Sequence, residues 1–361
     1  MEMQSKVTGK GEPLVLVPGG LTGWLSWEPH AERLSATRKV VRTQLLNVQY
    51  GLENRSLPTD YSVETESRAL ETTLDKLGLT MPLDLVAWSY GAAVTLDYAL
   101  SHPERVRSLT LIEPPALWVL RTQGLLDSEA KKTMEMLQTI KGDISESQLE
   151  QFMKSVGFVP PGKSAREMPQ WPLFVQHRQS LRNSPAVVEH EDDLQRLRDF
   201  KRPVLLVKGT GSARFLHQII DALAATLSNV QVVEMPAGHA PQVVSMDRFL
   251  ERLAIFQAGA NNQRQRIVGL RVNDSVLKNS SKIILFSQAG VETVTKDFAI
   301  VGAGLKCTSP GPSGPATFYE WWYLLSSHSW RRLIVPRSSE LNGIITRNAK
   351  AQKVLNGYRA I

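Results

Sequence analysis

The stretch that decides the fold is DLVAWSYGAAV, residues 84–94, in which an apolar run leads into a serine and several small residues. Residues 84–87 are typical of the end of a buried parallel strand, because both faces of such a strand are covered and its side chains do not alternate in polarity. Residues 91–100 favour a helix. The chain must therefore turn sharply at Ser89. We predict that this turn lifts the serine hydroxyl above the end of a sheet, where it can act as a nucleophile.

The first 257 residues alternate strand-like and helix-like segments. This pattern indicates an α/β fold, with a mostly parallel sheet and helices on both of its faces. Helical periodicity is clear over residues 63–77 and 215–227. The six predicted strands cover residues 13–20, 39–45, 83–89, 106–114, 203–209 and 230–236.

The gap between the fourth and fifth of these strands is too long for a simple crossover. It contains amphipathic stretches over residues 127–140 and 145–156, and a third helix is expected from Ser184 to Leu197. We interpret the whole gap as a helical cap. The predicted organisation is a core of residues 1–114 and 202–257, a cap of residues 115–201 and a C-terminal extension of residues 258–361.

The net charge of +7 is concentrated in the extension. Residues 258–361 hold 14 Lys and Arg against 5 Asp and Glu, whereas residues 1–257 hold 28 against 30. The near-neutral body offers no basic surface to a polyanion, so we expect no nucleic-acid partner. Because Ser, Asn, Gly and basic residues dominate the extension, we predict that it is poorly ordered. A basic aromatic arm that binds RNA is the alternative.

We predict no cofactor and no metal. The single cysteine, Cys307, excludes an internal disulfide and a thiolate-rich metal site. Residues 296–307 superficially resemble a flavin-binding fingerprint, but Cys307 occupies the place of its third glycine. No uncharged apolar run approaches the roughly 20 residues of a membrane span, and the first residues show no secretory signal. We therefore expect a cytoplasmic protein with no membrane partner, and the sequence leaves its oligomeric state open.

Four motifs in the expected order resemble the α/β-hydrolase superfamily, in its capped, serine-esterase-like form. Residues 14–24, LVLVPGGLTGW, resemble the family's first loop, with Pro18 where a histidine is usual. Residues 87–91, AWSYG, resemble Gly-x-Ser-x-Gly, with Ala87 at the first glycine. The last two motifs are SHPERVRSLTLIEPP at 101–115, like the strand that follows the elbow, and MPAGHAPQVVSMDRFLERL at 235–253, like the histidine loop and last helix.

The resemblance implies a catalytic triad with Ser89 as the nucleophile and His239 as the base. The acid departs from the common pattern. Its usual place after the fifth strand falls on Ser212, and the next carboxylate, Asp221, lies well inside the following helix. The other position used in the family, at the end of the preceding strand, holds Glu113. We predict that Glu113 orients the imidazole; a carboxylate from the cap is the alternative.

The resemblance also implies that the backbone N–H groups of Gly20 and Tyr90 form an oxyanion hole. Trp24 and Trp88 are predicted to line an apolar pocket for a small-molecule substrate. The predicted function is hydrolysis of a carboxylic ester or lactone through an acyl-enzyme. The alternatives are hydrolysis of a carbon–carbon bond by the same triad and ligand binding without catalysis. The cap residues that would select a substrate carry no recognisable code.

Overall fold

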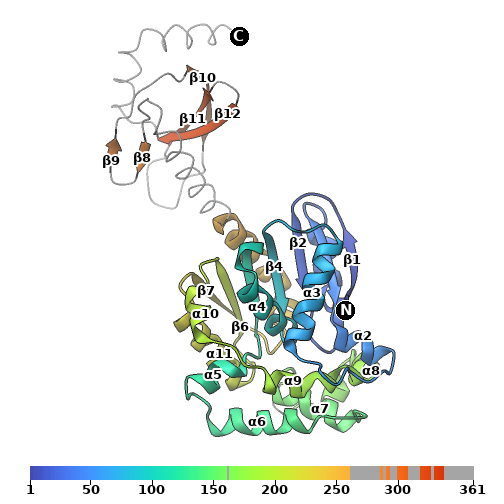
Figure 1. Ribbon diagram of the computed structural model, residues 1–361. Helices are drawn as coiled ribbons and strands as arrows, with labels where there is room; N and C mark the ends of the chain where they lie inside the picture. The colour runs from blue at the N-terminus through green and yellow to red at the C-terminus, as the bar shows by residue number, and fades with distance from the viewer. Residues whose placement is uncertain are drawn as a thin grey trace. The chain divides into compact units, whose positions relative to one another are not determined.

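The computed structural model describes residues 1–160 and 162–260, together with five strands further along the chain. Two compact units are present, Met1–Arg266 and Ile267–Ile361 (Figure 1). No helix in the described part of the chain is long and apolar enough to cross a bilayer.

A seven-stranded sheet forms the centre of the first unit, in the order β1-β3-β2-β4-β5-β6-β7. The six predicted strands are confirmed and run parallel to one another. The additional strand, β1, was not expected from the sequence and pairs antiparallel with β3 at the sheet edge. The strands are β1 (Gln4–Thr8), β2 (Pro13–Val17), β3 (Lys39–Gln44), β4 (Leu83–Trp88), β5 (Val106–Ile112), β6 (Val204–Gly209) and β7 (Val230–Met235).

Helices cover both faces of this sheet, as the sequence predicts. Successive residues of β2 point into different apolar clusters: Val15 packs in one, and Leu14 and Leu16 in the other. The larger cluster includes α3 (Val63–Lys76), α4 (Tyr90–Ser101) and α11 (Arg214–Thr226). The smaller cluster includes α1 (Glu28–Leu34) and the helical residues 246–260. The other short helices of the core are η1 (Gly23–Trp27), α2 (Leu46–Leu52), η2 (Pro103–Arg105) and α12 (Pro241–Val244).

A series of helices lies between β5 and β6, and residues 115–201 are called the cap below. The capping box predicted at Ser145 and Gln148 is present. The prediction of a single helix from Ser184 to Leu197 is wrong. The chain becomes extended at His190, and Asp193 then caps a new helix. The cap elements are α5 (Leu117–Thr122), α6 (Ser128–Thr139), α7 (Glu146–Ser155), η3 (Ala165–Glu167), α8 (Trp171–His177), η4 (Arg178–Asn183), α9 (Ser184–Glu189) and α10 (Leu194–Asp199).

The five described strands of the second unit pair antiparallel, β8 with β9 and β11 with both β10 and β12. These strands were not predicted from the sequence, although aromatic residues such as those of FYEWWYLLS favour strands. Residues 258–260 of the predicted extension continue the last helix of the first unit, and the rest of the extension lies outside the described residues. The strands are β8 (Leu285–Ser287), β9 (Gly290–Glu292), β10 (Ala299–Cys307), β11 (Phe318–Ser326) and β12 (Ser329–Pro336).

Candidate active site

Ser89 lies in the turn between β4 and α4, in a conformation that side chains rarely adopt. Its φ is +52° and its ψ is −126°, and such strain persists only where the surrounding structure imposes it. Here the Ser89 N–H donates to the Ile112 carbonyl on β5 at 2.9 Å. Two residues further on, a Cβ at Gly91 would lie 2.1 Å from the Pro18 carbonyl oxygen, so only glycine fits. The turn is therefore held tightly on both sides of the serine.

His239 lies on the loop that follows β7, with its ring directed at Ser89. The imidazole Nε2 is 2.8 Å from Ser89 Oγ. The loop itself is anchored at its backbone: the His239 N–H donates to the Gly157 carbonyl of the cap at 3.1 Å. The His239 carbonyl accepts a hydrogen bond from Trp88 Nε1 at 2.7 Å. The position of the imidazole is thus fixed by both the sheet and the cap.

Glu113 follows β5 and completes a hydrogen-bonded chain with His239 and Ser89. Its side chain is fully buried, and its φ is +46°. The carboxylate Oε2 accepts the Nδ1–H of His239 at 2.7 Å. The other oxygen, Oε1, accepts hydrogen bonds from the Gly209 N–H at 2.7 Å and the Ser212 hydroxyl at 2.5 Å. Every oxygen of this buried carboxylate is therefore paired, as a buried charge requires.

The other two residues considered for the acid position lie in different places. Ser212, at the usual acid position, is a hydrogen-bond donor to Glu113. Asp221 lies on α11 with its side chain 67% exposed, and it pairs with Lys208 Nζ at 3.2 Å. The structure thus brings Ser89, His239 and Glu113 together and leaves Asp221 outside the cluster. The Ser212 hydroxyl thus holds the Glu113 carboxylate, a role that was not predicted from the sequence.

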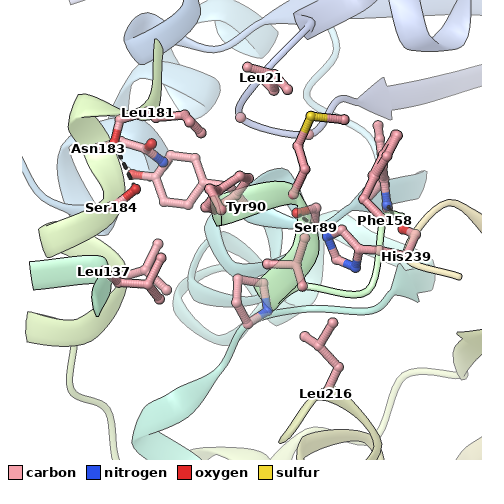
Figure 2. Close-up of a pocket in the computed structure, with 18 of the residues that line it drawn as sticks. Leu21, Ser89, Tyr90, Leu137, Phe158, Leu181, Asn183, Ser184, Leu216 and His239 are labelled. Atoms are coloured by element: carbon pink, nitrogen blue, oxygen red, sulfur yellow. Dashed lines mark hydrogen bonds between the residues drawn. The ribbon is translucent and has the colours of Figure 1, made fainter. Parts of the chain in front are cut away.

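A cavity adjoins Ser89 and His239 (Figure 2). None of the described residues that line it is Lys, Arg, Asp or Glu. The cap supplies about half of the wall, largely with apolar side chains. From the cap come Pro115, Leu137, Phe152, Met153, Val156, Phe158, Phe174, Leu181, Asn183, Ser184 and Val187; the remainder are Gly19, Gly20, Leu21, Thr22, Trp88, Tyr90, Phe215 and Leu216.

Of the two tryptophans predicted to line the pocket, only Trp88 does so. The prediction for Trp24 is wrong. The η1 helix turns the Trp24 ring toward β1, where Lys6 Nζ lies 4.5 Å from the ring centroid. The backbone N–H of Trp24 donates a hydrogen bond to Gln44 Oε1 at 2.9 Å. The loop after β2 therefore contributes its glycines, Leu21 and Thr22 to the cavity, but not this aromatic ring.

Gly20 and Tyr90, the residues expected to supply the oxyanion hole, both line the cavity next to Ser89. Tyr90 is the first residue of α4, where an N–H group has no acceptor inside the helix. Gly20 lies close by, since a Cβ added to it would be 3.1 Å from Tyr90 Cβ. Asn47 Nδ2 donates to the Gly20 carbonyl at 2.7 Å and to the Ser180 carbonyl of the cap at 2.9 Å. The Gly20 peptide is thereby fixed against the cap.

A cluster elsewhere, Glu64, Asp97 and His190, places three potential metal ligands within 4.8 Å of one another. His190 Nδ1 of the cap is 2.7 Å from Glu64 Oε1 on α3, and this bond lowers the pKa of Glu64 to about 2. Burial raises the pKa of Asp97. The cluster ties the end of α9 to the core.

The comparisons with known proteins agree with this architecture. The α/β hydrolase fold family matches residues 12–245. A 2-hydroxy-6-oxo-2,4-heptadienoate hydrolase of Pseudomonas putida is 36% identical over 120 residues, which are 32% of this chain and 42% of that protein. Lipase 1 of Psychrobacter immobilis is 24% identical over 267 residues, 70% of this chain and 79% of the lipase.

Among solved structures, an esterase from Thermogutta terrifontis has the same fold, with a TM-score of 0.55 at 19% identity. The match covers 72% of this chain and 93% of the esterase. The family match extends from the strand before the first loop to the helix after the histidine loop, and so includes Ser89, Glu113 and His239. The chain belongs to the α/β-hydrolase fold family.

Proposed function

We propose that the protein hydrolyses an uncharged carboxylic ester or lactone. The observation that carries the proposal is the continuous hydrogen-bonded chain of Ser89, His239 and Glu113 at the edge of an apolar cavity. Serine is a weak nucleophile at neutral pH and needs an adjacent base that is itself oriented. Here Ser89 is the nucleophile, His239 is the adjacent base, and Glu113 orients that base.

In the first half of the reaction, Ser89 Oγ attacks the ester carbonyl carbon while its proton moves to His239 Nε2. The buried Glu113 carboxylate holds Nδ1–H and stabilises the imidazolium that forms. The carbonyl oxygen becomes an oxyanion, which the N–H groups of Gly20 and Tyr90 would stabilise. The carbon–oxygen bond to the alcohol then breaks, and His239 protonates the departing alkoxide.

In the second half, water releases the acyl group from Ser89. His239 accepts a proton from the water as its oxygen attacks the acyl carbon, and it returns that proton to Ser89 Oγ as the acyl–enzyme bond breaks. The products are a carboxylic acid and an alcohol, or a hydroxy acid from a lactone. Water is the only co-reactant in this scheme.

The lining of the cavity favours a neutral substrate. A charged group moved from water into this cavity would meet no Lys, Arg, Asp or Glu among the described lining residues, and unpaired buried charges are strongly disfavoured. The alternative of carbon–carbon bond hydrolysis draws on the Pseudomonas relative, whose named substrate is a heptadienoate. A substrate of that kind carries a carboxylate, and the described lining of the cavity provides no Lys or Arg to pair with it.

A panel of p-nitrophenyl esters of increasing acyl length tests the proposal. We expect hydrolysis by the wild type, with turnover lowered by about 10⁴- to 10⁶-fold in Ser89→Ala and in His239→Ala, because the members of a triad act as a unit. Wild-type rates in folded Ser89→Ala would contradict it. Binding of the esters with no turnover by the wild type would favour the ligand-binding alternative.

A further inference from the structure

The cavity has a second polar region on its cap side. Figure 2 shows the Tyr90 ring extending from the elbow toward Asn183 and Ser184, away from Ser89 and His239. Asn183 and Tyr90 both line the cavity and are 4% and 3% exposed, respectively. A substrate that fills the cavity on this side therefore meets polar groups in an otherwise apolar wall.

A buried hydrogen-bonded chain stands behind Tyr90. Its hydroxyl is 2.9 Å from the Tyr61 hydroxyl, which donates to Glu66 Oε1 at 2.7 Å. When Glu66 is ionised, the Tyr61 proton goes to the carboxylate, so Tyr61 accepts at its oxygen and Tyr90 donates to it. In that state the oxygen of Tyr90 remains an acceptor toward the cap.

Both hydroxyls keep their protons over the physiological range. Burial is the main cause that raises the pKa of Tyr61 and of Tyr90 well above the ordinary value. Glu66 is itself held by the N–H groups of Leu46 and Asn47, at 2.9 and 2.8 Å. The chain is therefore a fixed part of the core rather than a mobile surface network.

Asn183 lies beside Tyr90 in the cavity wall on the cap side (Figure 2). A side-chain amide offers two donor hydrogens and an acceptor oxygen. Because Asn183 lines the cavity, its amide donors are within reach of a ligand there. Ser184 differs, since its hydroxyl is already engaged with the Leu181 carbonyl at 2.7 Å. Asn183 is thus the group in this region that is available to a ligand.

Asn183 also lies near the end of the cavity where the ester carbonyl would bind. Its Nδ2 would be 3.3 Å from a Cβ added at Gly20. A ligand oxygen that contacts the amide must then lie within a few bonds of the scissile carbonyl. That oxygen must also be uncharged, because the described lining of the cavity holds no Lys or Arg to neutralise an anion.

We propose that Asn183, beside Tyr90 in the cavity wall, is a specificity-determining residue that binds an uncharged hydroxyl or carbonyl oxygen on the acyl part of the substrate. The inference rests on the proposed function for the identity of the scissile bond. A buried amide loses a hydrogen bond when an apolar group replaces the substrate oxygen that it binds. A purely apolar pocket, by contrast, barely distinguishes a hydroxyl-bearing substrate from its apolar counterpart.

An isosteric pair of esters tests the subsite: the p-nitrophenyl esters of 3-hydroxybutyrate and 3-methylbutyrate, which differ by a hydroxyl in place of a methyl. We expect the wild type to prefer the hydroxy ester by about tenfold in kcat/KM, mainly through KM. Asn183→Leu should lower this ratio to one or below. Ser184→Ala is the matched control, and it should retain the preference because that hydroxyl is already paired.

Binding to the inactive Ser89→Ala variant separates this inference from the proposed function. Methyl 3-hydroxybutyrate and methyl 3-methylbutyrate are titrated against it, with Trp88 in the cavity wall as the fluorescent reporter. Tighter binding of the hydroxy ester supports the subsite even if the wild type hydrolyses neither ester. Equal binding, together with a wild-type kcat/KM ratio near one, overturns the subsite while leaving ester hydrolysis intact. This arm needs no substitution at Asn183, so it stands if Asn183→Leu does not fold.

Discussion

The Ser89 and Glu113 backbones share an unusual feature: both have positive φ, and both follow neighbouring parallel strands. A strand that continued in regular geometry would carry its next side chain along the sheet face. The positive φ instead turns each side chain above the sheet edge, where His239 reaches both. Strain of this kind is of the order of 1–3 kcal/mol per residue, and the hydrogen bonds of Glu113 to Gly209, Ser212 and His239 offset it.

Replacing Glu113 by glutamine tests its role in orienting the base. In Glu113→Gln the amide oxygen would stay with its two donors, Gly209 N–H and Ser212 Oγ, so the amide NH₂ group would face His239 Nδ1. That imidazole nitrogen would then have to accept, and Nε2 would carry the proton in front of Ser89. We expect kcat on a p-nitrophenyl ester to fall by roughly 10²- to 10⁴-fold, since a triad with the wrong imidazole tautomer loses its base.

Asp221→Asn is the matched control for this substitution. It makes the same acid-to-amide change on an exposed side chain that pairs only with Lys208 among the described residues. We expect kcat to stay at the wild-type value. The assignment of the acid would be wrong if Asp221→Asn lost activity and Glu113→Gln retained it.

Residue positions that depend on a motif could be predicted from sequence, and those that depend on packing could not. Ser89, His239 and Glu113 each follow a strand end, and the order of the strands brings such ends to one edge. Trp24 follows a strand as well, but the local η1 turn decides where its ring points. Asn183 was missed because nothing in the sequence indicates which side of a cap helix faces the cavity.

At the scale of secondary structure, Glu66 joins several elements of the core. It lies on α3, accepts the first N–H groups of α2 through Leu46 and Asn47, and takes the Tyr61 hydroxyl. Its side chain is fully buried. Desolvation raises the pKa of Glu66 to about 7, against 4.5 for an ordinary glutamate. The three hydrogen bonds act in the opposite direction and only partly compensate.

This shift predicts a pH-dependent stability. Between pH 4.5 and 7 the folded protein retains a proton on Glu66 that the unfolded chain releases, so the free energy of unfolding falls as pH rises through this window. The loss attributable to Glu66 is on the order of 3 kcal/mol above pH 7. Melting temperatures of wild type and Glu66→Gln, followed by tryptophan fluorescence from pH 5 to pH 8, measure it.

The difference in melting temperature between wild type and Glu66→Gln separates the effect of Glu66 from that of histidines that titrate in the same pH range. Burial lowers the pKa values of His30 and His177, which makes the folded protein less stable as pH falls, but both proteins share that effect. We expect the advantage of the wild type over Glu66→Gln to shrink as pH rises. A difference that is constant with pH would show that Glu66 does not titrate in this window.

The strands of the core could be predicted because buried parallel strands are continuous apolar runs. β1 escaped prediction for the opposite reason: QSKVT is mostly exposed and pairs only at the sheet edge. In the cap, the capping box gave the start of α7, whereas the end of α9 depends on the contact of His190 with Glu64. Contacts between distant segments of this kind have no local signature.

At the scale of the whole molecule, the proposed catalytic machinery lies within the first compact unit. The triad, the candidate oxyanion groups and the described cavity lining all fall within Met1–Arg266. A protein ending at Arg266 should therefore fold and hydrolyse p-nitrophenyl butyrate with kcat/KM within about twofold of the full chain, since a domain with its own core can fold alone. Loss of activity or a much lower melting temperature in the shortened protein would show that residues 267–361 contribute to the first unit.

The central claim is that Ser89 is an activated nucleophile. Labelling with a fluorophosphonate, followed by intact-mass measurement and peptide mapping, tests it most directly. The account predicts a single adduct on Ser89 that blocks ester hydrolysis, with labelling abolished in Ser89→Ala and strongly slowed in His239→Ala, which lacks the base. Absence of an adduct on the folded wild type, or an adduct on another residue while ester hydrolysis continues, would contradict it.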